Sequence, residues 1–477
     1  MDRVPLEIVQ QILQHVDGPS NLFKVVRVCR DFAALALPYL YEDVLWTDPQ
    51  RLARSLPVWS EHVALRFFVR SLTFSISYIE TGLIMRHPTL TLESDALVGT
   101  SGEVMRIGPG LSVISPIRRM PRGTLPERHQ STYLRPVQLY ADDALYGIAL
   151  GTLTGLSGLR RLSMTHSRLP DEIFTIMHEL PSLRELHVIG CIISLSALND
   201  SLPDYTSLQI TDLTLWGVYD TGPRAIQFQP DWDHVRPAPL HRFYSLLSCP
   251  TLRRLRLLIQ RDNDLIETLS VSATSPVAEI RQLLPRITAD LEELTYAWQD
   301  SFMARETGAP FSSLLQYLLQ SCPRISKLTS LDGDPMWMPE DALPRLRTYR
   351  GPAAKGLAMK LANSPIEHLV IESGTLLDPP SKNVSILSVL EELHPVQLPL
   401  RELSLSTLAW DVNLLYAVFA LFPDLHSLEL KYTIGCPSEI LLMSQGSNLI
   451  PRTPSLHTIA LFPIPGPIAN PKNPIEI

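Results

Sequence analysis

The residue types that could do chemistry are scattered along this chain of 477 residues, and one short stretch gathers several of them. Asp231-Trp232-Asp233-His234 brings two carboxylates and an imidazole together, a combination that could touch a metal ion. Pro230, Pro237 and Pro239 surround the stretch, and such surroundings are typical of a plain exposed turn. We therefore favour the exposed turn and predict no metal site.

Signatures of the common enzyme classes are missing as well. The chain has no GxSxG, GxxxxGK[ST] or HExxH motif, and no GxGxxG that follows an expected strand. No CxxC pair occurs, so neither a disulfide framework nor a zinc ribbon is indicated by the five cysteines, Cys29, Cys191, Cys249, Cys322 and Cys436. We expect a non-catalytic protein that needs no cofactor. An enzyme whose active site lies in insertions, outside any motif, is an alternative.

The chemistry that remains is recognition, and an internal repeat positions it. The pattern Leu-x-x-Leu-x-Leu, preceded by a short helix-like stretch, recurs eleven times with some variation. Its fourth position falls at residues 162, 186, 213, 255, 294, 328, 349, 369, 403, 428 and 459. Several of the spacings match a leucine-rich repeat of 20–29 residues, and the longer ones indicate insertions on one face.

Stacking explains why the leucines recur. Each copy supplies one short strand and one helix, and a copy alone cannot bury its apolar side. The expected fold is therefore α/β, an irregular leucine-rich-repeat solenoid whose curved parallel sheet carries helices on its convex side. Residues between the leucines then form the concave surface. There Trp216, beside Arg254 and Arg256 on the next strand, is the best candidate for target binding, together with His187. Alternatively, Trp216 packs under the Asp220–Pro239 insertion.

A different architecture precedes the repeats. Pro5 can start a helix whose apolar residues recur at three- and four-residue steps, and Asp17-Gly18-Pro19 ends it. Ser20 can cap a second helix, and a third runs from Arg30 to Leu37, before Pro38. The first helix carries more apolar residues than two small neighbours could cover, namely Ile8, Val9, Ile12, Leu13 and Val16. This surplus predicts a protein partner.

These residues resemble a known motif. Val4-Pro5-Leu6-Glu7-Ile8, Ile12-Leu13 and Leu22…Val25…Val28-Cys29-Arg30-Asp31-Phe32 are similar to the F-box, although many F-boxes carry Trp where Phe32 stands. Pro38-Tyr39-Leu40-Tyr41-Glu42-Asp43-Val44 resembles the continuation in fungal F-box proteins, whose irregular leucine-rich repeats the copies also resemble. An ordinary three-helix start of a globular domain is the alternative.

The resemblance implies docking onto the Skp adaptor of a Skp–cullin–F-box ubiquitin ligase. The residues it assigns to the adaptor are Val4, Pro5, Leu6, Ile8, Ile12, Leu13, Leu22, Val25, Val28, Cys29 and Phe32. The repeats would hold a target protein for ubiquitination, and the chain itself would do no bond chemistry. A leucine-rich-repeat scaffold or adaptor without a ligase role is the alternative function.

Composition and charge indicate which classes of partner and which cellular compartment to expect. The net charge of −8 argues against general binding of nucleic-acid backbones. The start lacks a signal-peptide pattern, and uncharged runs such as 144–159 are too short to span a bilayer, so we expect no membrane contact and an intracellular location, cytoplasmic or nuclear.

The expected domain organisation has five parts: the helical module 1–45, a linker with the first solenoid units 46–100, a flexible Pro/Gly/Arg-rich insertion 101–136, the solenoid 137–462 and a proline-rich tail 463–477. The arginines of the insertion could contact an acidic or phosphorylated partner, but a solvated loop is favoured.

Overall fold

The computed structural model describes residues 4–16, 18–75, 147–170, 172–193, 207–221, 235–237, 242–260, 287–288, 290–299, 313–331, 343–372, 385–435 and 453–464. The expected insertion 101–136, the stretch Asp231–His234, Cys436 and nearly all of the tail 463–477 lie outside these residues.

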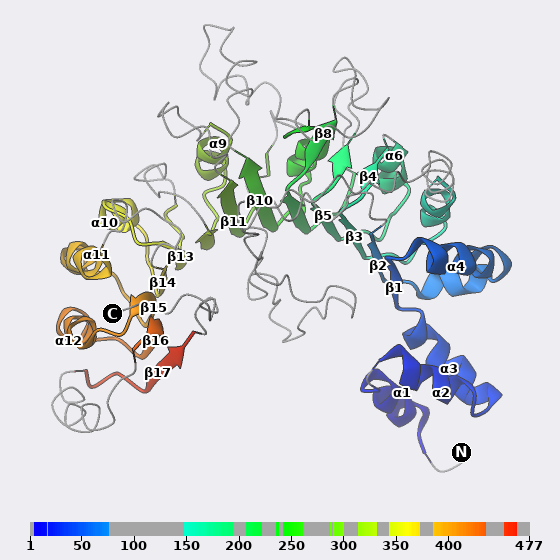
Figure 1. The fold of residues 1–477 in the computed structure, drawn as a ribbon, viewed down its shortest axis with the longest axis horizontal. Helices are drawn as coiled ribbons and strands as arrows, with labels where there is room; N and C mark the ends of the chain where they lie inside the picture. The colour runs from blue at the N-terminus through cyan, green and yellow to red at the C-terminus, as the bar shows by residue number, and fades with distance from the viewer. Residues whose placement is uncertain are drawn as a thin grey trace, which may run out of the picture.

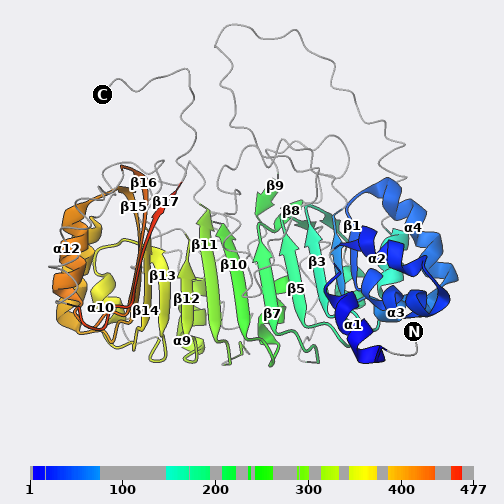
Figure 2. The ribbon, with the colours of Figure 1, turned by 90° about the horizontal axis from the view of Figure 1, so that it is seen from below.

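A curved sheet of thirteen parallel strands forms the body of the protein, with its strands side by side in chain order (Figures 1 and 2). The strands are β1 (Asp43–Trp46), β2 (Ser71–Phe74), β3 (Arg161–Thr165), β5 (Glu185–Ile189), β7 (Asp212–Trp216), β10 (Arg254–Gln260), β11 (Glu293–Gln299), β12 (Lys327–Ser330), β13 (Thr348–Pro352), β14 (His368–Glu372), β15 (Glu402–Ala409), β16 (Ser427–Ile434) and β17 (Thr458–Pro463).

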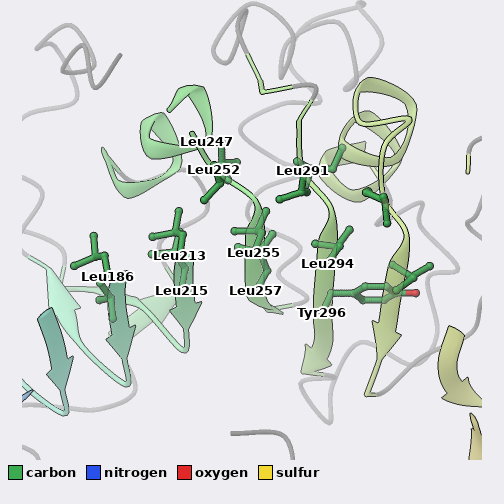
Figure 3. Packing of buried hydrophobic residues seen from close by; sticks show 14 of the residues in the cluster. Leu186, Leu213, Leu215, Leu247, Leu252, Leu255, Leu257, Leu291, Leu294 and Tyr296 are labelled. Carbon is green, nitrogen blue, oxygen red and sulfur yellow. The ribbon is translucent and has the colours of Figure 1, made fainter. Parts of the chain in front are cut away.

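The leucine repeat sets the register of this sheet. All eleven predicted positions lie directly opposite one another on neighbouring strands, for example Leu213 opposite Leu255 and Leu255 opposite Leu294. Val44 and Leu72 extend the row onto β1 and β2, which the repeat pattern did not reveal. A second inward row follows two residues later, and Figure 3 shows both rows filling one continuous core. The expected solenoid is confirmed.

Helices lie along the outer, convex side of the arc (Figure 1). They are α6 (Glu172–His178), η6 (Arg242–Ser248), α9 (Ser313–Ser321), α10 (Leu357–Leu361), α11 (Ile386–Leu393), η9 (His394–Val396) and α12 (Val412–Leu421). Their apolar residues enter the same core as the strand leucines, and Phe174 of α6 packs on Phe243 of η6 with ring centroids 4.8 Å apart. The helices therefore cover the core on one side, and the sheet covers it on the other.

Aromatic side chains close the core at its first units. Helix α4 (Pro49–Glu61) and the 3₁₀ helix η1 (Val63–Phe68) cover β1 and β2. Trp46 packs edge-on against both Trp59 and Phe74, and Tyr41 packs edge-on against Trp59. A repeat array needs a distinct terminal unit, because the last layer has no neighbour to bury it, and these rings supply one.

A small second sheet, not predicted from the sequence, runs beside the first units. Its strands are β4 (Arg168–Leu169), β6 (Ile192–Ile193), β8 (Tyr219–Thr221) and β9 (Val235–Pro237). The turns that lead to its first three strands each place one residue in the left-handed region, His166 (φ 48°), Gly190 (φ 60°) and Gly217 (φ 60°). In these turns the Gly190 N–H donates to the Trp216 carbonyl at 2.7 Å, which ties neighbouring repeats together.

Three short helices precede the sheet: α1 (Leu6–Gln14), α2 (Pro19–Val26) and α3 (Arg30–Leu40). Two sequence expectations were wrong here. Helix α2 starts at Pro19 after Gly18, so Ser20 lies inside the helix and does not cap it. Helix α3 continues past Pro38, because a proline in the last turn disturbs few hydrogen bonds, and the Tyr41 N–H still donates to the Leu37 carbonyl at 3.1 Å.

This three-helix module has its own small core, centred on Val9, Leu13, Leu22 and Ala36 and separate from the core of the solenoid. It lies beyond the β1 end of the arc, and α3 contacts η1 there (Figure 1). The expected boundary at residue 45 falls within β1, which pairs with β2 as the first strand of the sheet.

Candidate functional site

Exposed apolar side chains are concentrated on the three-helix module. Six of the fifteen most exposed large apolar side chains in the described part of the chain lie between residues 4 and 28, each between 44 and 66% exposed. We call them the module surface: Val4, Leu6, Ile8, Ile12, Phe23 and Val28. An apolar surface of this kind on a small module is typical of a protein contact.

Helical geometry explains why the module cannot cover this surface itself. Val9 and Leu13 form the buried stripe of α1. At 100° per residue, Ile8 and Ile12 lie to one side of that stripe and Leu6 lies to the other, so the apolar arc is wider than the contact with α2 and α3. The predicted surplus of apolar residues on the first helix is therefore present in the fold.

The residues predicted to bind the adaptor differ in their exposure. Seven of them are exposed, namely Val4, Pro5, Leu6, Ile8, Ile12, Val28 and Cys29. Val25 and Phe32 are half-buried. Leu13 (3% exposed) and Leu22 (7% exposed) face the module's own core and hold the helices together. Phe23 was missed, because it lies off the apolar stripe that Leu22 marks.

A ladder of opposite charges lies on the concave surface at the first residues of β3, β5, β7, β10, β11 and β12. Arg161 pairs with Glu185, Arg254 with Asp212, and Lys327 with Glu293, in each case across two neighbouring strands at the same register. Further along, His368 Nδ1 lies 2.8 Å from Glu402 Oε2. Arg254, predicted to bind a target, therefore already has a carboxylate partner, with its Nη2 2.7 Å from Asp212 Oδ2.

The other predicted target-binding residues come together on strands β5, β7 and β10. His187 lies opposite Thr214, which lies opposite Arg256, and Arg256 is half-buried without an ion-pair partner among the described residues. Trp216 follows two residues after Thr214 on the same side of β7, but only 6% of it is exposed. The alternative for Trp216, cover by the 220–239 segment, involves residues mostly outside the described ones.

Two buried ring nitrogens in this group have no hydrogen-bond partner among the described residues, Nδ1 of His187 and Nε1 of Trp216. A buried polar atom without a partner costs roughly 1–3 kcal/mol. Among the described residues, the group therefore combines one guanidinium that has no ion-pair partner with two buried nitrogens that have no hydrogen-bond partner, which distinguishes it from the paired charges beside it.

Comparison with known proteins adds only architectural likeness. No protein-family model and no curated protein matches the sequence. Similar solved structures include the Toll–Spatzle complex of Drosophila (10% identity, TM-score 0.31, 66% of this chain and 42% of that chain) and the TLR13–ssRNA13 complex (11%, 0.23, 66% and 51%). Another is the plant peptide hormone receptor RGFR1 in complex with RGF2 (12%, 0.22, 65% and 49%).

The chain spans about half of the length of these proteins or less. Its assignment to the leucine-rich repeats therefore depends on the register of its own thirteen strands.

Two further findings concern the part of the chain that the structure describes. It contains no group of three or more His, Cys, Asp or Glu side chains that could hold a metal ion, and none of its helices is both long and apolar enough to cross a bilayer. Among its cysteines, Cys29 is exposed, whereas Cys191, Cys249 and Cys322 are buried. Burial raises the pKa of the Cys191 thiol to about 12.

Burial of His187 makes stability depend on pH. The pKa of His187 is lowered to about 4, mainly by burial and next by the charge of Arg256, with smaller lowering contributions from Arg161 and Arg254, while Glu185 opposes these effects. The unfolded chain, with an ordinary histidine pKa near 6.5, binds this proton more tightly, so acidification favours unfolding in this range. We expect the contribution of His187 to the free energy of unfolding to fall by about 2 kcal/mol between pH 7 and pH 5.

Urea unfolding of the wild type and of His187→Gln at both pH values tests this expectation. The variant should lose about 2 kcal/mol less than the wild type on acidification. Equal losses in the two proteins would show that folding does not lower the pKa of His187. Burial also lowers the pKa of His166, which contributes with the same sign and remains in both proteins as an internal reference.

Proposed function

We propose that this chain is the substrate-recognition subunit of a Skp–cullin–F-box ubiquitin ligase. The three-helix module would dock on the Skp adaptor and, through it, on a cullin. The solenoid would hold a target protein, and a conjugating enzyme recruited elsewhere in the complex would supply the ubiquitin. The chain would act by proximity, because holding a target lysine near activated ubiquitin makes the transfer almost intramolecular.

One observation carries this proposal: the module surface stays open although the module has a core of its own. Burying one large apolar side chain completely contributes roughly 1.5–3 kcal/mol, so covering six half-exposed ones is worth several kcal/mol. The sequence resemblance of residues 4–32 to the F-box names the partner that would cover them. The long concave sheet supports the second half of the proposal, since extended concave surfaces of repeat proteins are suited to protein targets.

Charges placed on the module surface test the docking. Ile8→Asp with Ile12→Asp puts two carboxylates into the apolar contact, and we expect adaptor affinity to fall at least tenfold by titration calorimetry. The matched control is Gln10→Asp with Gln11→Asp, which adds the same charge to the exposed, opposite side of α1 and should bind within about twofold of wild type. Circular dichroism of both variants verifies that the helices remain.

Cys29 provides an independent readout, because its thiol is exposed next to Val28. Saturation with the adaptor should slow its alkylation, followed by mass spectrometry of the Cys29 peptide, at least fivefold in the wild type. No slowing and no complex in gel filtration would refute the docking. A complex with the adaptor that never recruits a cullin would instead favour a leucine-rich-repeat scaffold without a ligase role.

A further inference from the structure

Three arginines interrupt the charge compensation of the sheet. Arg70, Arg160 and Arg184 immediately precede strands β2, β3 and β5, at the edge of the sheet where the strands begin. Their backbones are directly paired, since the Arg160 N–H donates to the Arg70 carbonyl at 2.7 Å and the Arg184 N–H donates to the Arg160 carbonyl at 2.8 Å. We call these three residues the arginine row. With neighbouring strands about 4.8 Å apart, it places three guanidinium groups along roughly 10 Å of edge.

At two other places along this edge an arginine at the same position has a carboxylate partner. Arg253 forms an ion pair with Glu292, and Arg347 Nη1 lies 4.0 Å from Glu367 Oε1, in each case across neighbouring strands. Within the described residues, no carboxylate lies within ion-pair distance of Arg70, Arg160 or Arg184. The arginine row therefore differs from these two paired arginines by being three unpaired arginines on neighbouring strands; Arg401, before β15, is a single arginine at the same position that also lacks an ion pair among the described residues.

The guanidinium groups are open to a partner. Arg160 is exposed, and Arg70 and Arg184 are half-buried. Arg70 donates from Nη1 to the Gly158 carbonyl at 3.1 Å, and Arg184 from Nη1 to the carbonyls of Leu183 and Gln209, both at 3.3 Å. These bonds use part of each fork and orient it, while a guanidinium has five N–H donors in all. Donors therefore remain for an anion.

Like charges on neighbouring strands are unfavourable, and the overall charge of −8 makes such a positive cluster unusual for this chain. Violations of a local rule without a structural gain tend to occur at functional sites. A ligand that fits must supply several negative charges in a row and must accept hydrogen bonds. Carboxylates match this, because the guanidinium fork binds them in two-pronged fashion.

We propose that the arginine row is the docking site for an acidic segment of a partner protein. This proposal depends on the receptor function proposed above only where it identifies that partner with the ubiquitination target. The site lies at the first solenoid units, next to the end that bears the three-helix module (Figure 1). An acidic segment bound there would hold its protein close to the module while the concave sheet stays free for a second contact.

The test uses the full chain and a labelled decaglutamate peptide, followed by fluorescence anisotropy at low salt. Arg70→Gln with Arg160→Gln and Arg184→Gln should weaken binding at least fivefold. Arg253→Gln with Arg347→Gln is the matched control, because it removes two arginines from the same edge that already have carboxylate partners. This control should bind within twofold of wild type. Binding should also weaken with added salt, since screening acts on exposed charges.

Several outcomes would overturn the proposal: equal binding by wild type and triple variant, equal losses in both variants, or no binding of decaglutamate by the wild type. Tighter binding of a ten-nucleotide single-stranded DNA than of decaglutamate would also overturn it, in favour of a phosphate-backbone ligand. Adaptor binding by the triple variant separates the two proposals. If that binding persists while decaglutamate binding is lost, both stand; if the wild type binds decaglutamate but never the adaptor, only the proposed function fails.

Discussion

Replacing Leu294 by alanine is expected to lower the free energy of unfolding by about 3–4 kcal/mol and to separate unfolding into two transitions. Leu294 is 1% exposed and lies in the middle of the leucine row, opposite Leu255 on one side and Leu328 on the other. Truncation leaves a cavity, because the neighbouring repeats on the two sides cannot both move in to fill it. Because each repeat contacts only its neighbours, a weak layer in the middle uncouples the two ends.

Thr295→Ala is the matched control for this substitution. Thr295 is the next residue on β11, is half-buried and points to the concave side, so its truncation should cost less than about 0.5 kcal/mol. Urea unfolding followed by circular dichroism and by tryptophan fluorescence reports the two effects. A single transition with coincident probes in Leu294→Ala would contradict the uncoupling, and a loss below 1 kcal/mol would contradict the cavity.

The solenoid could be predicted from sequence because leucine spacing reports directly on burial. Every predicted copy contributes a strand at the expected register, including copies in which Tyr349 or Ile459 replaces leucine. The first two strands lie outside the leucine pattern, since β1 carries Val44 at the leucine position and a long segment separates β2 from the next copy; they could be predicted from the β-like run Val44–Trp46 and from the alternation that ends at Phe74. The small second sheet escaped it as well, because strands of two or three residues have no periodicity.

Side-chain pairing could not be predicted, because it depends on register between distant residues. The sequence pattern left Arg254 available for a target, yet Asp212, 42 residues earlier, lies opposite it and forms an ion pair with it. The arginine row is hidden for the same reason, since Arg70 and Arg160 become neighbours only when β2 pairs with β3. On the module the opposite holds: the surplus of Ile8 and Ile12 followed from helical spacing within one element.

Replacing Gly190 by alanine is expected to lower the free energy of unfolding by about 3 kcal/mol. The residue adopts φ 60°, where a side chain costs roughly 1–2 kcal/mol. A Cβ atom there would also lie 2.5 Å from Nδ1 and 2.8 Å from Cε1 of His166, so the imidazole would have to move. That ring belongs to the equivalent turn of the preceding repeat, so the contact joins two repeats through one glycine.

A double-mutant cycle separates the two causes. In a His166→Gly background the steric conflict is gone, and Gly190→Ala should then cost only the conformational part, about 1–2 kcal/mol. Gly151→Ala is the control, because Gly151 lies in a helical stretch with no atom within 4 Å of the added Cβ, and it should stabilise the fold by about 0.5–1 kcal/mol. An unchanged cost in the His166→Gly background would mean that backbone strain alone requires the glycine. The left-handed residue that directly follows β3, β5 and β7 would then be a property of each repeat by itself, and not of the contact between two of them.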